Sequence, residues 1–198
     1  MTRIWKHRLF WPIASLLGLI VINSVARPQF LSITMRDGEL YGALINILRN
    51  SAPLMLVALG MTIVIATRGI DLSVGAVMAV SGAVALTVID NAADPDNLGT
   101  VLGAVGLAVL VSLALGAWNG FLVAVLGIQP IIATLVLMLA GRGVALLITG
   151  GFITTVNSAP FSYIASGYLT VLPFAFFISV AAITLIALVE RRTALGVL

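Results

Sequence analysis

Long apolar runs, separated by short polar stretches, extend along the whole chain. The runs cover residues 9–26, 51–67, 72–89, 100–126, 131–148 and 170–189. At a rise of about 1.5 Å per residue, runs of this length approach the roughly 30 Å hydrocarbon core of a bilayer when they are helical. The pattern predicts an all-α fold: a polytopic transmembrane helical bundle of about six spans, forming one domain over residues 1–198.

The first long polar break has a helical pattern of its own. Residues 27–50 are mixed in character, and the apolar spacing from Leu40 to Leu48 predicts a short amphipathic helix leading into the next span. Ser51 suits the N-cap of that span and Pro53 suits its first turn. We therefore interpret residues 27–50 as an amphipathic entry segment that precedes the second span.

A second long break, residues 149–169, carries no charged side chain. An uncharged and partly apolar connector either dips back into the protein at membrane depth or lies along the membrane interface. Its hydroxyl and amide groups also suit contact with a partner on the outer side. The sequence leaves these alternatives open.

The composition supports the membrane interpretation and excludes several kinds of chemistry. The chain is 61% hydrophobic and 9% charged, with a mean hydropathy of +1.21, whereas soluble domains carry about 25% charged residues. It contains no cysteine, its one histidine is His7 and its one lysine is Lys6. Disulfides, thiolate metal sites, histidine triads and a GxxxxGK phosphate loop are therefore excluded. We expect no catalytic residue, no metal site and no cofactor bound by this chain.

The basic residues indicate an orientation rather than a nucleic-acid partner. They are scattered and lie mostly beside apolar runs, so no phosphate-binding face is predicted. Six spans with a cytoplasmic N-terminus satisfy the positive-inside rule and also place residue 198 in the cytoplasm. Six basic residues then lie inside and three outside: Arg3, Lys6, Arg8, Arg68, Arg191 and Arg192 against Arg27, Arg36 and Arg49.

Polar side chains within or between the spans are the candidates for function, because a charged group at a helix centre costs about 2.5–3.5 kcal/mol on insertion scales. Seven residues are candidates for a substrate pathway or gate: Arg68, Asp71, Ser73, Asn119, Gln129, Thr134 and Arg142. Short apolar runs interrupted by glycine, as around residues 68–73, also point to discontinuous helices whose ends face a substrate.

Each candidate also has a purely structural interpretation. Gly69 suits a left-handed helix C-cap and Asp71 suits the N-cap of the next helix, which would leave a simple turn. Asn119 lies between Gly116 and Gly120, a GxxxG pattern that predicts close packing of another helix. Both interpretations remain open here.

The same holds for the two candidates farther along the chain. Pro130 marks a helix start, so Gln129 lies beside free N–H groups that could meet sugar hydroxyls, although a plain turn is equally compatible. Arg142 lies about 11 residues into its span and must snorkel, pair or face a polar cavity. Asp71 is the one acidic side chain between the spans that could reach it, as a structural ion pair.

Several of these residues lie in motifs of a known family. Residues 60–78 (GMTIVIATRGIDLSVGAVM), 118–120 (WNG), 128–135 (IQPIIATL) and 140–145 (AGRGVA) occur in the order found in ribose-type sugar permeases, the membrane subunits of bacterial ABC importers. The chain resembles this family from about residue 40 to 196. Arg68 stands where the family usually has glycine.

Within the family, three further stretches make the chain most similar to the permeases of galactofuranose importers: residues 37–42 (DGELYG), 137–145 (LMLAGRGVA) and 193–196 (TALG). Family members continue with further spans and a cytoplasmic segment that docks the ATPase. The resemblance therefore implies that residues 1–198 are the N-terminal part of a longer domain, as a fragment or as a truncated gene product.

The resemblance also implies a function and a set of partners. It implies a permease of the bacterial inner membrane that carries a monosaccharide by alternating access. Its expected partners are a second permease subunit of the same or another kind, ABC ATPase subunits that bind ATP and Mg, and a periplasmic sugar-binding protein. The alternatives are an ATP-independent channel or secondary transporter, an intramembrane enzyme acting on lipid-linked sugar, and a structural scaffold.

Overall fold

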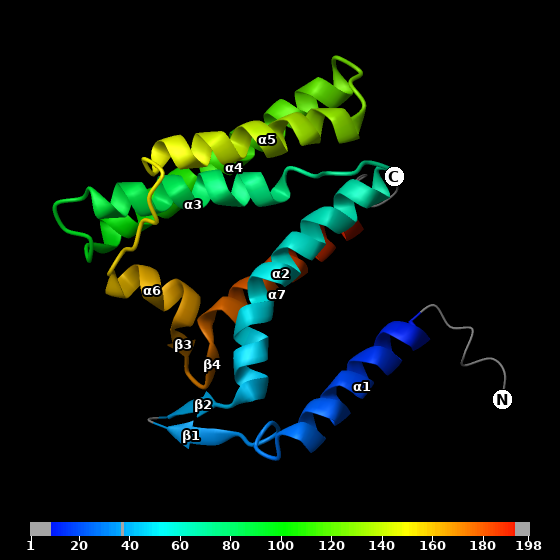
Figure 1. Cartoon of the computed structure of the whole chain (residues 1–198), viewed down its shortest axis with the longest axis vertical. Coiled ribbons are helices and arrows are strands. Elements are labelled where there is room, and N and C mark those ends of the chain that lie inside the picture. Colours follow the sequence, from blue (N-terminus) through cyan, green and yellow to red (C-terminus); the bar gives the residue numbers. More distant parts are fainter. Residues whose placement is uncertain (1–8, 37, 193–198) are drawn as a thin grey trace.

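The computed structural model describes residues 9–36 and 38–192 of the chain, and helices dominate this part (Figure 1). The helices are α1 (Phe10–Ala26), α2 (Ala43–Ala66), α3 (Val74–Asp90), α4 (Leu98–Ala124), α5 (Pro130–Ile148), α6 (Ala159–Ser166) and α7 (Phe174–Arg192). The predicted helical fold is confirmed. The basic start at residues 3–8 and the motif at residues 193–196 lie outside the described residues.

Four of the described helices are long and apolar enough to cross a bilayer: α2, α4, α5 and α7. Helices α1 and α3 are equally apolar but have 17 residues each. At about 1.5 Å per residue, 17 residues reach about 26 Å, slightly less than the hydrocarbon core. The six predicted runs thus correspond to four full-length and two shorter apolar helices.

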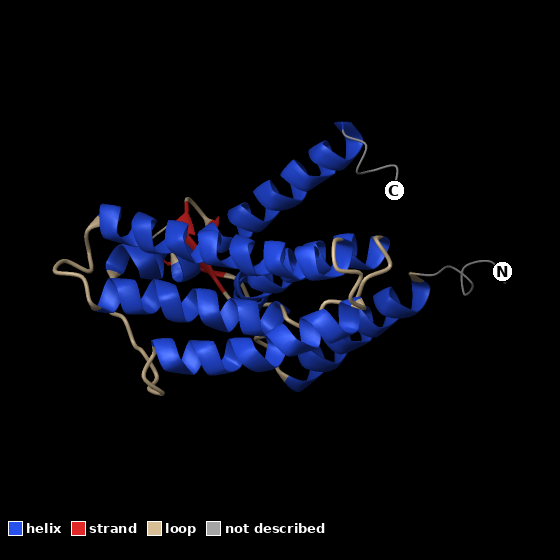
Figure 2. Ribbon diagram, turned by 90° about the horizontal axis from the view of Figure 1, so that it is seen from above, coloured by secondary structure: helices blue, strands red, loops and turns tan. Residues whose placement is uncertain are grey.

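Two small antiparallel hairpins interrupt the helices (Figure 2). Strands β1 (Thr34–Arg36) and β2 (Glu39–Tyr41) pair in the first, and β3 (Tyr168–Leu169) and β4 (Leu172–Pro173) pair in the second. The first lies inside the predicted entry segment of residues 27–50. The second occupies the predicted start of the last span, so α7 begins at Phe174 instead of residue 170.

The predicted helix before the second span is present from residue 43, but it is not separate from that span, so the assignment of Ser51 and Pro53 to a helix start is wrong. Residues 43–50 form the first two turns of a continuous α2, with Pro53 in its interior. Ser51 donates its hydroxyl to the carbonyl oxygen of Leu48 at 3.0 Å instead of capping a helix. Figure 1 shows α2 changing direction along its length, as expected where proline removes a backbone donor.

Helix α7 packs against α2 next to this proline. The hydroxyl of the fully buried Ser179 lies 3.0 Å from the carbonyl oxygen of Ala52 and 3.1 Å from that of Ala175 on its own helix. A hydroxyl that reaches a carbonyl of the neighbouring helix adds a hydrogen bond across the α2–α7 pair.

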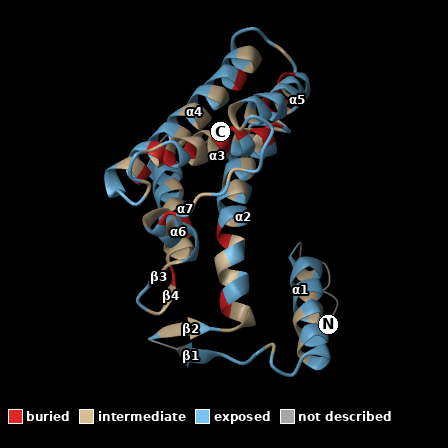
Figure 3. Cartoon of the chain, turned by 60° about the vertical axis from the view of Figure 1, so that its left-hand side comes forward, coloured by how far each residue is buried: buried red, intermediate tan, exposed pale blue. Residues whose placement is uncertain are grey.

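The densest packing lies in a second group, formed by α3, α4 and α5. Ile89, Val101 and Ala104 are buried where α3 meets α4, and Phe161 and Ile164 of α6 pack against them. Buried residues therefore gather on the facing sides of this group (Figure 3). The α3–α4–α5 group is inclined to the α2–α7 pair (Figures 1 and 3).

Helix α6 connects the two groups, because it packs against both α4 and α7. Asp96, in the turn between α3 and α4, accepts a hydrogen bond from the backbone N–H of Ala159 at 2.8 Å. Ser158 donates to the carbonyl oxygen of Pro95 at 2.8 Å. The uncharged connector of residues 149–169 is thus anchored to the α3–α4 turn by two hydrogen bonds at the start of α6.

Much apolar surface remains uncovered. The accessible surface of the chain is 13828 Å², against about 8,900 Å² for a compact water-soluble monomer of this mass. Large apolar side chains are exposed along every long helix, and α1 has no buried residue. A surface of this kind is suited to lipid or to other membrane helices.

The turn after α2 ends in a left-handed residue, but that residue is Arg68 (φ +60°) instead of the predicted Gly69. The N–H of Arg68 donates to the carbonyl of Ile65 at 2.9 Å, and the N–H of Gly69 donates to that of Val64 at 3.0 Å. These two bonds form a Schellman motif, in which the left-handed position favours glycine. Asp71 is likewise not the N-cap of α3, because that position belongs to Ser73.

We expect Arg68→Gly to raise the free energy of unfolding by about 1 kcal/mol, because glycine adopts a positive φ without the steric cost that a side chain carries. Thermal unfolding in detergent, followed by circular dichroism, measures the difference. Arg68→Lys keeps the charge and the Cβ and should leave stability unchanged. A gain in Arg68→Lys equal to that in Arg68→Gly would attribute the effect to the side chain instead of the backbone.

Candidate functional site

Four of the predicted candidates meet where the α2–α3 turn lies against α4 and α5. The turn contributes Asp71 and Ser73, α4 contributes Asn119 and α5 contributes Thr134. Asn119 bonds to Ser73 across 46 residues of sequence, and Thr134 bonds to the backbone carbonyl of Ile70 in the same turn across 64 residues. We call these four residues the polar junction.

Asp71 and Ser73 form the part of the junction that fixes the start of α3. One carboxylate oxygen of Asp71 accepts from the backbone N–H of Ser73 at 2.7 Å and from its hydroxyl at 2.6 Å. A carboxylate beside the first turn of a helix is also stabilised by the positive end of the helix dipole. Asp71 thus stabilises the start of α3, as its position suggested. It does so by accepting hydrogen bonds from Ser73, the N-cap residue, instead of being the N-cap itself.

Asn119 extends this network into α4. Its amide nitrogen donates to the hydroxyl oxygen of Ser73 at 3.0 Å, and Asn119 is 8% exposed while Ser73 is 1% exposed. The Ser73 hydroxyl has one hydrogen, which it donates to Asp71, so it can only accept from Asn119. The side-chain amide of Asn119 therefore faces Ser73 with its nitrogen and not with its oxygen.

The carbonyl oxygen of the Asn119 side chain, Oδ1, is buried without a hydrogen-bond partner among the described residues. A buried acceptor without a donor costs about 1–3 kcal/mol. The junction therefore holds one acceptor that is free to bind a water molecule or a hydroxyl group.

Thr134 connects α5 to the same turn. Its hydroxyl lies 2.8 Å from the carbonyl oxygen of Pro130 in its own helix and 3.3 Å from that of Ile70 in the turn. Thr134 is 4% exposed, so this link is shielded. The turn is thus held from two sides, by α4 through Asn119 and by α5 through Thr134.

Helices α3 and α5 approach each other closely at Gly141. A Cβ added there would lie 3.0 Å from the Cβ of Ala76 on α3. Both residues are buried, whereas Arg142, the neighbour of Gly141, points to the exposed side of α5. Sequence reasoning missed this contact, although small residues facing each other are the known signature of close helix packing in membranes.

The other three pathway candidates are not part of the junction. Arg68 and Gln129 are exposed at the ends of α2 and α5, and Gln129 makes no side-chain cap bond, although α5 does begin at Pro130 as predicted. Arg142 is exposed and, within the described part of the chain, forms no ion pair with Asp71. The suggested structural ion pair is therefore wrong for this chain, and a pathway role for these residues remains a prediction.

Gly116 and Gly120 are not packing positions in the described part of the chain. A Cβ at either would meet nothing within 4 Å, and both residues are exposed on α4. The GxxxG prediction is not met by any helix among the described residues. It stays a prediction for a contact with another polypeptide.

Chemically, the junction is suited to holding and orienting. It offers a carboxylate, a hydroxyl that bridges Asp71 and Asn119, and an amide. No group of three metal-ligating side chains occurs among the described residues. The arrangement suits positioning of a helix junction and contact with a neutral hydroxyl group.

The family of permease components of the branched-chain amino acid transport system matches residues 43–198. The chain is 46% identical over 198 residues to the galactofuranose transporter permease protein YtfT of Escherichia coli strain K12, covering 96% of this chain and 56% of the relative. It is 39% identical over 202 residues to the fructose import permease protein FruF of Bifidobacterium longum, covering 99% and 55%.

A shorter match, 40% identical over 137 residues, is to the ribose import permease protein RbsC of E. coli K12, covering 69% of this chain and 38% of the relative. The chain thus spans about half the length of YtfT and FruF, the two relatives that match nearly all of it. No solved structure matches. The family match covers more than half of the chain and includes all four residues of the polar junction, so the chain belongs to the family of branched-chain amino acid transport system permease components.

Proposed function

We propose that the chain is the membrane-spanning permease subunit of a bacterial ABC importer that carries a monosaccharide across the inner membrane. The observation that supports this most strongly is the family match over residues 43–198. Relatives named for galactofuranose, fructose and ribose support a sugar as the cargo. Galactofuranose is our proposed substrate, since the relative with 46% identity over nearly the whole chain is named for it.

The polar junction supports a role in conformational change rather than in chemistry. It lies where the α2–α7 pair joins the α3–α4–α5 group, so a rotation of one group against the other would act on the turn at residues 67–73. Importers of this kind work by such rigid-body changes between outward and inward states. In our proposal, the junction keeps α3, α4 and α5 together as one moving unit.

The partners in this proposal follow from the energy source. The chain has no phosphate-loop motif, so separate ATPase subunits bind ATP and Mg and drive the change of state. A second permease subunit completes the translocation path, and a periplasmic sugar-binding protein delivers the cargo to the outer face. The N-terminus and residue 198 lie in the cytoplasm in this orientation.

Transport in reconstituted vesicles tests the proposal. The chain is expressed in its natural host with an affinity tag, the complex that co-purifies is reconstituted, and uptake of labelled galactofuranose, ribose and fructose is measured with and without ATP. We expect an ATPase subunit in the purified complex and uptake that stops without ATP. Uptake that persists without ATP would identify a channel or a gradient-driven carrier instead.

A further inference from the structure

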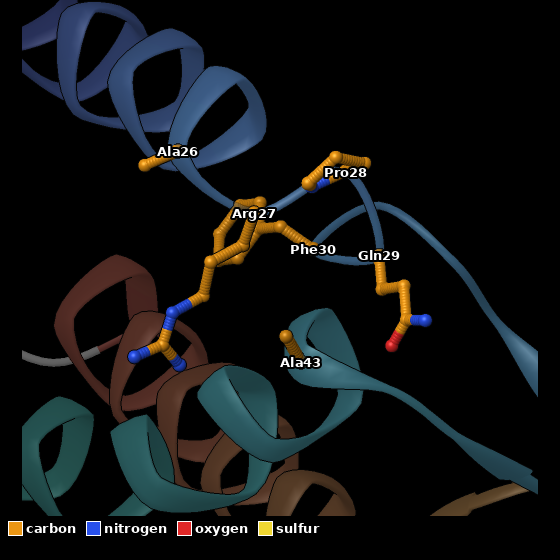
Figure 4. Close-up of a pocket in the computed structure, with 6 residues that line it drawn as sticks. All are labelled: Ala26, Arg27, Pro28, Gln29, Phe30 and Ala43. Atoms are coloured by element: carbon orange, nitrogen blue, oxygen red, sulfur yellow. The ribbon is translucent and has the colours of Figure 1, made fainter.

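A cavity of about 520 Å³ lies between the end of α1 and the start of α2, away from the polar junction. It is lined by Ala26, Arg27, Pro28, Gln29, Phe30 and Ala43 (Figure 4). With this volume, the cavity is large enough for a sizeable polar group.

The charge on the cavity wall is positive. Figure 4 shows the guanidinium of Arg27 extending away from α1 towards α2, with the Gln29 side chain on the other side of the opening. Arg27 forms no ion pair within the described residues. The first residue of α2, Ala43, belongs to the same wall, and the start of a helix carries a partial positive charge. The cavity thus favours an anion, and a guanidinium is suited to phosphate oxygens.

The surface of α1 next to the cavity is apolar and exposed. Arg27 directly follows the 17 residues of α1, so it lies where an apolar helix leaves the hydrocarbon region. Val21, Ile22 and Val25, in the last two turns of α1, are 60%, 64% and 79% exposed. Figures 1 and 3 show α1 standing apart from the other helices. A ligand with a charged head and long apolar tails fits a positively charged cavity that adjoins an exposed apolar helix.

We propose that this cavity binds the headgroup of an anionic glycerophospholipid, with its phosphate on Arg27 and its acyl chains along α1. The lipid fills the gap between α1 and α2 and connects α1 to the rest of the bundle. A free inorganic phosphate would satisfy Arg27 but leave the apolar surface of α1 uncovered. The choice of a lipid therefore depends on Arg27 and α1 together.

Native mass spectrometry of the purified chain tests this proposal. The chain is taken from bilayer discs that hold equal parts of phosphatidylglycerol and phosphatidylethanolamine, and the retained lipids are counted. We expect retention of phosphatidylglycerol, and a loss of roughly tenfold in Arg27→Ala, because that variant removes the charged hydrogen-bond donor from the cavity. Arg142→Ala, which removes the same charge from α5, should retain the lipid. Ala26→Trp should also lose it, because the larger side chain fills the cavity while Arg27 stays.

Three results would overturn the proposal. The first is equal lipid retention by the wild type and Arg27→Ala, with circular dichroism confirming that both are folded. The second is displacement of the lipid by inorganic phosphate at the same concentration, which would identify a free anion. The third is a lipid-free dimer, which would place a second copy of the chain in the gap. None of these results depends on transport, so they test the lipid site separately from the proposed importer function.

Discussion

Gly141→Val is expected to lower the free energy of unfolding by about 2 kcal/mol. A Cβ at this position lies 3.0 Å from the Cβ of Ala76, and valine adds two further methyl groups to that contact. Overpacking of a close contact typically costs about 1–3 kcal/mol because the helices must separate. Denaturant or thermal unfolding of the detergent-solubilised chain, followed by circular dichroism, measures the loss.

Gly143→Val is the matched control for this prediction. Gly143 lies on the same helix two residues later, and a Cβ there meets nothing within 4 Å. Both variants gain the same side chain and the same change in helix propensity, so the difference between them isolates the contact between α3 and α5. Equal stability of the two variants would show that α3 and α5 do not approach as closely as the structure indicates.

The sequence predicts the long helices well because hydrophobic runs of membrane length have few alternatives in lipid. Its errors lie where a local signal has two meanings. Ser51 and Pro53 resemble a helix start, but α2 continues through them, since a helix tolerates an interior proline where neighbouring helices supply compensating contacts. Ser179, which donates to the Ala52 carbonyl next to that proline, lies in α7. No local sequence pattern connects Ser179 with Ala52.

In the candidate site, too, the identity of the residues was predictable and their contacts were not. Residue type and position were enough to select Asp71, Ser73, Asn119 and Thr134, because polar side chains are rare in this chain and costly in a membrane. Their meeting was not predictable, since the hydrogen bonds cross 46 and 64 residues and depend on how three helices pack. The same reasoning selected Gly116 and Gly120 for packing, whereas the close contact is at Gly141. A small-residue pattern identifies a capacity for close packing but not the helix that uses it.

Ser73→Ala is expected to lower the free energy of unfolding by about 1–3 kcal/mol, because it removes the hydroxyl on which the polar junction depends. Without that hydroxyl, the buried amide nitrogen of Asn119 has no acceptor and Asp71 loses one of its two donors. A buried polar group left without a partner pays its full desolvation cost. Ser112→Ala makes the same chemical change where the hydroxyl bonds only to Ala108 in its own helix, so it should change stability by less than about 0.5 kcal/mol.

The double variant Ser73→Ala with Asn119→Leu distinguishes a network from two separate contacts. Asn119→Leu removes both the amide nitrogen that Ser73→Ala leaves unpaired and the Oδ1 acceptor that has no partner in the described structure. Replacing both members of a buried hydrogen bond by apolar groups is often nearly neutral. The double variant should therefore be more stable than Ser73→Ala alone. Additive losses from the two substitutions would mean that Ser73 and Asn119 act independently, and that the turn is held to α4 by apolar packing instead of the hydrogen bond.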